Sequence, residues 1–148
     1  MGTKYQGTDI ERRALNTYIK LHRAAETSLS RTTRLLSDYG LTLSQFAVLE
    51  ALYHLGAMSQ TDLANKLLKS TGNMTSVLKG MEKRDLITRT RSEIDNRYME
   101  VDLTNKGRDL IAGYFPKHVE IIVEDMSILT SEEQDQLAAL CRKLGLQE

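Results

Sequence analysis

The sequence contains almost no cysteine and no long hydrophobic run. Its single cysteine, Cys141, cannot form an internal disulfide, which is typical of a protein from a reducing cytoplasm. No stretch of 18 consecutive apolar residues occurs, and the polar first seven residues hold no apolar run for a secretion signal. We therefore expect a cytoplasmic protein without a membrane partner. We expect Cys141 to be a small core residue, with a redox sensor as the alternative.

Patterns typical of enzymes and metal sites are also missing. The sequence has no Ser/His/Asp order, no phosphate-binding glycine loop, no H-E-x-x-H and no paired-cysteine spacing. Its three histidines, His22, His54 and His118, are scattered singly along the chain. We therefore expect no enzymatic activity, no bound metal and no cofactor.

The net charge is zero, which by itself argues against a nucleic-acid-binding protein. The positive charge is concentrated, however, between Lys66 and Arg91. This segment holds seven basic residues against two acidic ones, Glu82 and Asp85, so it carries +5 and the rest of the chain carries −5. A basic patch on an otherwise acidic molecule indicates a localised anionic partner, the alternative being a solvated charged face.

Capping patterns predict a chain of mainly α-helices. A hydroxyl-bearing residue at the start of a helix accepts a hydrogen bond from a backbone N–H in the first turn. The predicted helix starts are Thr8, Thr42, Ser59, Ser70, Thr104 and Thr130.

Two of these helices are long. Apolar residues recur every three or four positions from Ile10 to Leu36, which predicts a helix of about 30 residues with Gly40 as its stop. A domain of this size cannot bury so long a stripe by itself, so a second chain is the expected partner. In the helix that follows Thr104, Pro116 predicts a kink or break near Tyr114.

The middle of the chain combines a helix-turn-helix with a β-hairpin. Only Leu68 and Lys69 separate a short third helix from the cap at Ser70, which is typical of a helix-turn-helix. Residues 86–91 then read as a strand, and within residues 98–103 Met99, Val101 and Leu103 alternate with polar or amphipathic neighbours. The six residues between the two segments are polar apart from Ile94. This hairpin is predicted to reach into solvent as a wing.

The helix that begins at Ser70 is suited to the DNA major groove. Its outward face is small and hydrogen-bonding in the first turns and cationic in the last, and its N-terminal N–H groups attract phosphate. Gly72 and Gly80 each cost about 1 kcal/mol relative to alanine, which a face that meets only water does not explain. The alternative is the solvated face of an amphipathic helix.

At the wing tip, Arg97 is placed to enter a minor groove, and Asp95 is placed to brace Arg97 or Arg91 through a charge-assisted hydrogen bond. The alternative is an exposed surface ion pair. In all, ten residues are expected to bind DNA: Ser70, Thr71, Asn73, Thr75, Ser76, Lys79, Arg89, Arg91, Asp95 and Arg97.

At this point the chain resembles the multiple antibiotic resistance regulator (MarR) family of bacterial transcription factors. The resemblance rests on residues 59–64 (Ser-Gln-Thr-Asp-Leu-Ala), 72–78 and 81–87, and most of all on the Asp-Asn-Arg of 95–97 followed by 101–107. The closing stretches, 115–118 and 126–145, are similar to a branch of regulators of aromatic and quinone detoxification genes.

The resemblance implies a homodimer that binds a palindromic operator in double-stranded DNA, usually represses, and is released by a phenolic ligand or an oxidant. It implies that Arg97 enters the minor groove with Asp95 as its brace, while Thr71, Asn73 and neighbouring residues of that helix face the major groove. Redox-sensing members carry their reactive cysteine in the first helix, whereas Cys141 lies in the last.

The predicted fold class is mainly α with a small β-wing, a winged helix-turn-helix flanked by N- and C-terminal dimerisation helices. Residues 1–40 would form the N-terminal dimerisation helix, 41–104 the DNA-binding domain and 105–148 the C-terminal dimerisation helices, with one family domain over 8–146. A pocket for a small aromatic ligand, where the dimerisation helices meet the DNA-binding domain, would be lined by His22, Tyr53 and His54. The alternative is that these three are plain core residues.

Two functions therefore remain open. The first is a ligand-responsive dimeric repressor, and the second is a winged-helix module for protein interaction with no role on DNA. The +5 segment and the small-residue face of the helix after Ser70 favour the first.

Overall fold

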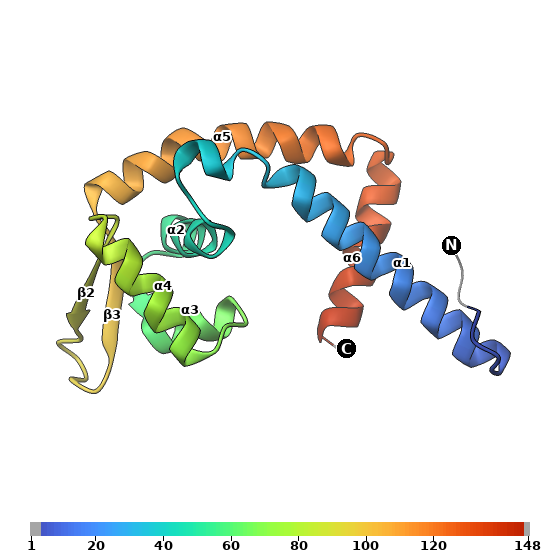
Figure 1. Cartoon of the computed structure of the whole chain (residues 1–148), viewed down its shortest axis with the longest axis horizontal. Helices are drawn as coiled ribbons and strands as arrows, with labels where there is room; N and C mark the ends of the chain where they lie inside the picture. The colour runs from blue at the N-terminus through green and yellow to red at the C-terminus, as the bar shows by residue number, and fades with distance from the viewer. Residues whose placement is uncertain (1–3, 147–148) are drawn as a thin grey trace. The chain divides into compact units, whose positions relative to one another are not determined.

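The computed structural model describes residues 4–146, which are mainly α-helical with a small antiparallel sheet (Figure 1). The elements are α1 (Asp9–Thr32), the 3-10 helix η1 (Leu36–Tyr39), α2 (Leu43–Leu55), β1 (Met58–Ser59), α3 (Gln60–Lys66), α4 (Thr71–Lys83), β2 (Ile87–Arg91), β3 (Met99–Leu103), α5 (Asn105–Met126) and α6 (Ser131–Leu146). All six predicted capping residues accept a hydrogen bond from the backbone N–H three positions later. The predicted fold class, mainly α with a small β-wing, is confirmed.

The chain divides into two compact units, and the division falls within α5. The winged unit comprises Leu35–His118, and the helical unit comprises the described residues before 35 and after 118. No helix in the described part of the chain is both long and apolar enough to cross a membrane. The functional division into dimerisation helices (1–40 and 105–148) and a DNA-binding domain (41–104) stays a prediction.

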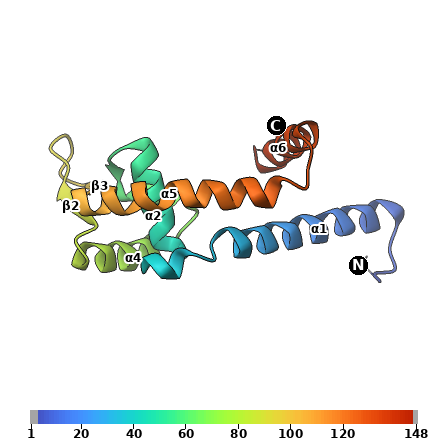
Figure 2. The same ribbon diagram turned by 90° about the horizontal axis from the view of Figure 1, so that it is seen from above.

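In the winged unit, three strands form a sheet in the order β1-β3-β2. β2 and β3 are antiparallel and pair from Ile87 with Leu103 to Arg91 with Met99, so their connection forms the predicted wing. The hairpin projects away from the helices of this unit (Figures 1 and 2). β1 was not predicted, because two residues are too short to show a period.

The core of the winged unit is built by α2, α3, α4, α5 and the sheet. Leu49, Leu63, Leu78 and Val101 are completely buried, and each comes from a different element. On α4, Met74, Leu78 and Met81 are buried, while Val77 is half-buried. The opposite face of α4 is therefore the one exposed on the molecule.

The start of α5 is fastened to the turn between α4 and β2. The Thr104 hydroxyl donates to the Asp85 carbonyl oxygen at 2.6 Å, and the Thr104 N–H donates to the Leu86 carbonyl oxygen at 3.1 Å. Asp85 itself has a left-handed backbone (φ 57°), which turns the chain from α4 into β2. A Cβ at Gly107 would lie 2.0 Å from the Leu86 carbonyl oxygen, so only glycine permits this approach.

In the helical unit, α1 ends at Thr32, earlier than the predicted stop at Gly40. The hydroxyls of Thr32 and Thr33 donate to carbonyl oxygens of the preceding turn at 2.9 and 2.6 Å, which competes with continuation of the helix. Leu36 already belongs to the core of the winged unit, and Gly40 closes η1 with a left-handed backbone. The prediction of one helix up to Gly40 was wrong because the apolar period continues past the last helical hydrogen bond.

α5 continues through Pro116 without a break, so the predicted interruption near Tyr114 is not a break of the helix. Proline lacks an N–H and removes one helical hydrogen bond. On either side of it, however, Tyr114 and His118 are buried, with exposed fractions of 0% and 6%. Within the winged unit, α5 is thus packed on both sides of Pro116.

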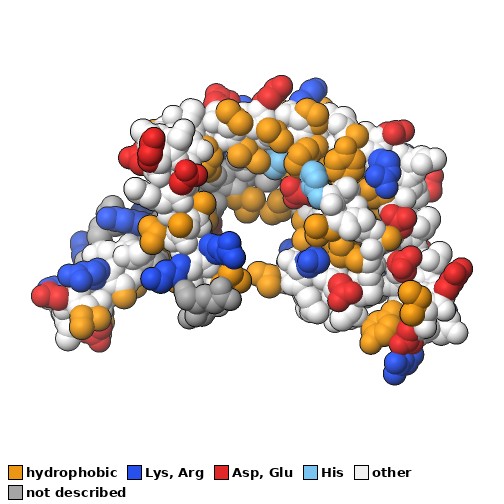
Figure 3. Space-filling model, turned by 180° about the vertical axis from the view of Figure 1, so that it is seen from behind, with side chains coloured by type: hydrophobic (Ala, Val, Ile, Leu, Met, Phe, Trp, Pro, Cys, Tyr) orange, Lys and Arg blue, Asp and Glu red, His pale blue; other side chains and the backbone are white. Residues whose placement is uncertain are grey.

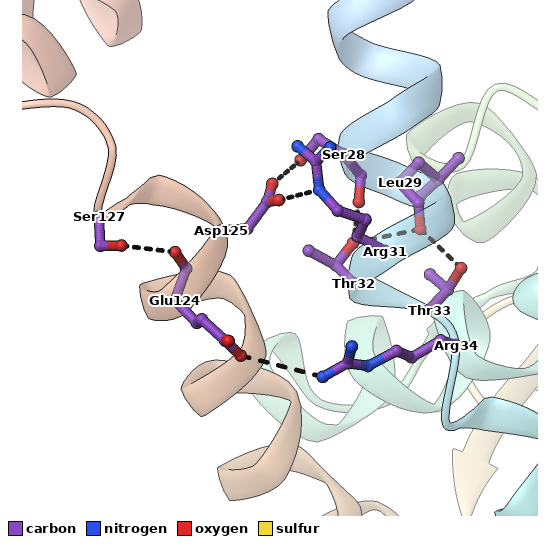
Figure 4. Close-up of polar contacts among 9 residues, drawn as sticks. All are labelled: Ser28, Leu29, Arg31, Thr32, Thr33, Arg34, Glu124, Asp125 and Ser127. Carbon is purple, nitrogen blue, oxygen red and sulfur yellow. Dashed lines mark hydrogen bonds and ion pairs between the residues drawn. The ribbon is translucent and has the colours of Figure 1, made fainter.

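Polar contacts fasten α1 to the end of α5 within the helical unit (Figure 4). The Asp125 carboxylate accepts hydrogen bonds from the Ser28 hydroxyl, at 2.6 Å, and from the Arg31 guanidinium. Both contacts favour the charged form, so they lower the pKa of Asp125. Arg34 lies 3.9 Å from Glu124 and adds a weaker ion pair.

Much of the apolar surface of the helical unit has no cover within one chain. Ile10 and Tyr18 of α1 are 80% and 63% exposed, and no described residue of α6 is buried. Hydrophobic side chains are open to view on these helices in Figure 3. Cys141 is exposed on α6, so the expectation of a core cysteine was wrong. It lies instead at a cavity of about 540 Å³ lined by Leu21, Ala25, Leu129 and Leu137 among others.

Replacing Gly107 with alanine should destabilise the protein by about 2 kcal/mol, because the new methyl group collides with the Leu86 carbonyl and forces α5 to move. The free energy of unfolding from urea titration measures this effect. Gly113→Ala is the matched control: it lies in the same helix, an added Cβ meets nothing within 4 Å, and the substitution should be neutral or stabilising by up to about 1 kcal/mol. Equal effects of the two substitutions would contradict the close approach.

Candidate nucleic-acid interface

α4 begins at a helix cap and has an exposed polar face. The Ser70 hydroxyl accepts from the Asn73 N–H at 3.2 Å, and no acidic residue lies in the first turn to repel an anion. Thr71, Asn73, Ser76 and Lys79, all predicted to bind DNA, are exposed. The N-terminal end of α4 is therefore compatible with a negatively charged partner.

The two glycines of α4 are not required by the packing of this chain. A Cβ added at Gly72 or Gly80 would meet no atom within 4 Å. Each glycine nevertheless weakens the helix by about 1 kcal/mol relative to alanine. Open space beside helical glycines leaves room for a molecule that approaches the helix closely.

Thr75 differs from its neighbours because its hydroxyl is already engaged within the chain. It donates to the Thr71 carbonyl oxygen at 2.9 Å and accepts from the Gln60 Nε2 at 2.8 Å. Gln60 is the first residue of α3 and was not among the predicted site residues. Its partner lies 15 positions away, so no local spacing rule identifies the pair.

Two arginines of the basic segment have structural partners. Arg89, predicted to bind DNA, is only 18% exposed and donates to the Glu82 carboxylate at 2.6 and 3.0 Å, which joins β2 to α4. Arg84 donates to the Gly40 carbonyl oxygen at 2.7 Å. Arg91 at the end of β2 is exposed, and no ion pair joins it to another residue in the 4–146 range. The positive charge available to a partner is therefore smaller than the count of basic residues between Lys66 and Arg91 indicates.

The wing tip holds its arginine in one orientation. Arg97 donates from Nε and Nη2 to the two oxygens of Asp95 at 3.0 and 2.8 Å, and its backbone N–H donates to the same carboxylate at 3.0 Å. These contacts lower the pKa of Asp95 and raise that of Arg97. Asp95 thus pairs with Arg97 and not with Arg91. Arg97 remains 83% exposed, so its guanidinium is oriented before any partner arrives.

The tip backbone is held by its own hydrogen bonds. The Ser92 hydroxyl accepts from the N–H groups of Ile94 and Asp95 at 3.3 and 3.4 Å, and the Tyr98 N–H donates to the Asp95 carbonyl oxygen at 3.0 Å. Ile94 is 98% exposed at this turn. The wing tip is therefore a hydrogen-bonded turn.

The predicted ligand residues fall into different units. His22 lies on α1 in the helical unit, where its Nδ1 is 3.5 Å from a carboxylate oxygen (Oε2) of Glu26. Tyr53 and His54 lie on α2 in the winged unit, with ring centroids 5.1 Å apart, and His54 lies 4.6 Å from Phe115 of α5. Phe115 was missing from the predicted lining, because α2 and α5 meet only through the fold.

Buried aromatic rings lie next to Tyr53, His54 and Phe115. Tyr114 contacts Phe46 at a centroid distance of 5.3 Å, and burial raises the pKa of Tyr114. Phe46 also lies 4.7 Å from His118. Tyr53, His54 and Phe115, which we call the aromatic rim, are half-buried or exposed and border this core.

Comparison with known proteins places the chain in one family. The sequence model of the MarR family matches residues 41–98. The chain is 31% identical over 134 residues to the HTH-type transcriptional regulator MhqR of Bacillus subtilis strain 168, covering 90% of this chain and 92% of the relative. It is also 31% identical over 146 residues to YkoM, an uncharacterised HTH-type transcriptional regulator of the same organism, covering 99% and 94%.

A solved structure shares the fold over most of both chains. BpsR of Bordetella bronchiseptica, whose structure addresses the regulation of its DNA binding by 6-hydroxynicotinic acid, superposes with a TM-score of 0.78 at 26% identity. The match covers 87% of this chain and 98% of BpsR. The chain therefore belongs to the MarR family, and it is a DNA-binding winged helix-turn-helix transcriptional regulator and not an enzyme.

Proposed function

We propose that the protein is a dimeric repressor that binds a palindromic operator through α4 and the wing and is released by a small phenolic or aromatic ligand. The observation that carries the DNA-binding part is the outward face of α4, where exposed small polar side chains flank two glycines with open space beside them. A helix that must approach base edges closely needs such a face. The protein would act in the cytoplasm, on double-stranded DNA.

A second copy of the chain is the partner that the helical unit requires. The exposed apolar residues of α1 and the lack of any buried residue in the described part of α6 support burial against another chain. Residues 1–40 and 105–148 would then form the dimerisation helices, and residues 41–104 the DNA-binding domain. A two-fold dimer would place its two α4 helices about 34–36 Å apart, one turn of DNA, which is the reason for expecting a palindrome.

Within each DNA-binding domain, the predicted contacts with DNA have different roles. Asn73 and Ser76 would read base edges, Lys79 and Arg91 would neutralise phosphates, and Arg97 would enter the minor groove. The remaining residues act by position: Ser70 as the helix cap, Thr71 beside it, Thr75 through its hydroxyl contacts, Arg89 through Glu82, and Asp95 through Arg97.

The aromatic rim is the proposed place for the ligand. Tyr53, His54 and Phe115 offer ring faces to a small aromatic molecule, and the rings behind them are already packed. The effect of 6-hydroxynicotinic acid on BpsR supports a ligand of this kind. The participation of His22, which lies on α1 in the helical unit, stays a prediction. Oxidation of Cys141 is the alternative signal, because this thiol is exposed on α6.

DNA binding should depend strongly on salt. A protein that neutralises about 6–10 phosphates loses roughly 10³–10⁵ in affinity between about 50 and 200 mM salt, because bound counterions are released. A gel-shift titration on the DNA upstream of the protein's own gene, repeated at several salt concentrations, measures the slope. Absence of any shifted complex at low salt would support the protein-interaction module instead.

Arg97→Ala should weaken operator binding by roughly 10-fold or more and lower the salt slope by about 1, since it removes the cation at the wing tip. Fluorescence anisotropy with labelled operator measures both quantities. Arg108→Ala is the control, because Arg108 is an exposed arginine on α5. Size-exclusion chromatography should give the same dimer for both variants. Unchanged affinity of Arg97→Ala would contradict the assigned role of the wing.

A thermal-shift screen with phenolic acids and quinones tests the ligand. We expect at least one compound to raise the melting temperature and to release the operator, and His54→Ala should reduce both effects because it removes one ring of the rim. His22→Ala then reports whether α1 takes part. If no compound produces either effect, the protein is a constitutive DNA binder and the ligand proposal is wrong.

A further inference from the structure

Gln60 places an amide group against the DNA-facing side of α4. It is the first residue of α3, and its Nε2 lies 2.8 Å from the Thr75 hydroxyl oxygen. Thr75 is exposed on α4 and lies one helical turn after Thr71. Two helices of the helix-turn-helix are thus joined at the face assigned to the major groove.

The chemistry of the contact fixes which way the amide points. The Thr75 hydroxyl has one hydrogen, which it donates to the Thr71 carbonyl oxygen at 2.9 Å. Toward Gln60 the hydroxyl can therefore only accept, so Nε2 and not Oε1 must face it. One Nε2 hydrogen and the Oε1 acceptor of Gln60 remain, and no hydrogen bond joins them to another residue within 4–146.

The available polar atoms at this point of the face therefore belong to Gln60 rather than to Thr75. A carboxamide presents a donor and an acceptor side by side, which matches the N7 acceptor and the N6 amino group of adenine in the major groove. Because Thr75 already orients the amide, less side-chain freedom is lost when it binds.

We propose that Gln60 reads an adenine in each half-site of the operator and that Thr75 is the positioning residue that orients it. This inference rests on the DNA-binding function proposed above. It extends base reading to α3, whereas the first helix of such a motif ordinarily crosses the DNA backbone.

Selection of binding sequences from a random DNA pool tests the proposal. The wild-type chain should enrich a two-fold operator with adenine at one position per half-site. Gln60→Ala should reduce the preference for that adenine by roughly 5- to 100-fold, and Gln60→Glu should shift it toward cytosine, whose N4 amino group donates to a carboxylate. Thr75→Val, which keeps the shape but removes the hydroxyl, should relax the same position and no other.

Two controls separate reading from folding. Asn65→Ala removes another exposed amide from α3 and should leave every preference unchanged. Asn73→Ala should alter a different position. Melting temperatures of all variants establish that they are folded.

Either of two results would overturn the role of Gln60. One is an unchanged preference in Gln60→Ala and Thr75→Val, and the other is an equal loss of affinity for every sequence. If the wild-type chain enriches no sequence at all, the proposed DNA-binding function itself fails, and the role of Gln60 fails with it.

Discussion

The winged unit depends on the close contact between Gly107 and the Leu86 carbonyl. At this point the end of α4, the start of β2 and the start of α5 meet, and Thr104 bonds to the carbonyl oxygens of both Asp85 and Leu86. The ion pair between Arg89 and Glu82 ties β2 to α4 a second time. The face of α4 and the wing tip are therefore presented by one rigid scaffold, which a reader of two neighbouring grooves requires.

The charge of the basic segment is divided between structure and function. Arg84 and Arg89 are bonded within the chain, whereas Lys79 and Arg91 are exposed. A sequence count cannot make this division, because it does not say which cation meets a carboxylate. The net charge of zero is then compatible with DNA binding, since what matters is the local field at the exposed cations.

Features governed by local spacing could be predicted from the sequence. Helix caps act over three residues and strands show a two-residue period, so the caps from Thr8 to Thr130 and the wing were found. Features set by tertiary packing were not. The end of α1, the two-residue strand β1, the pair of Gln60 with Thr75 and the position of Phe115 beside His54 all depend on segments distant in sequence. Cys141 was misplaced because α6 is not covered within one chain.

The most direct test of a dimer that reads DNA through α4 and the wing is a hydroxyl-radical footprint on the upstream DNA. Two protected backbone segments with centres about 10 base pairs apart are predicted, one for each half-site, and each is flanked by minor-groove protection that disappears in Arg97→Ala. A single protected half-site, or flanking protection that persists in Arg97→Ala, would contradict this arrangement.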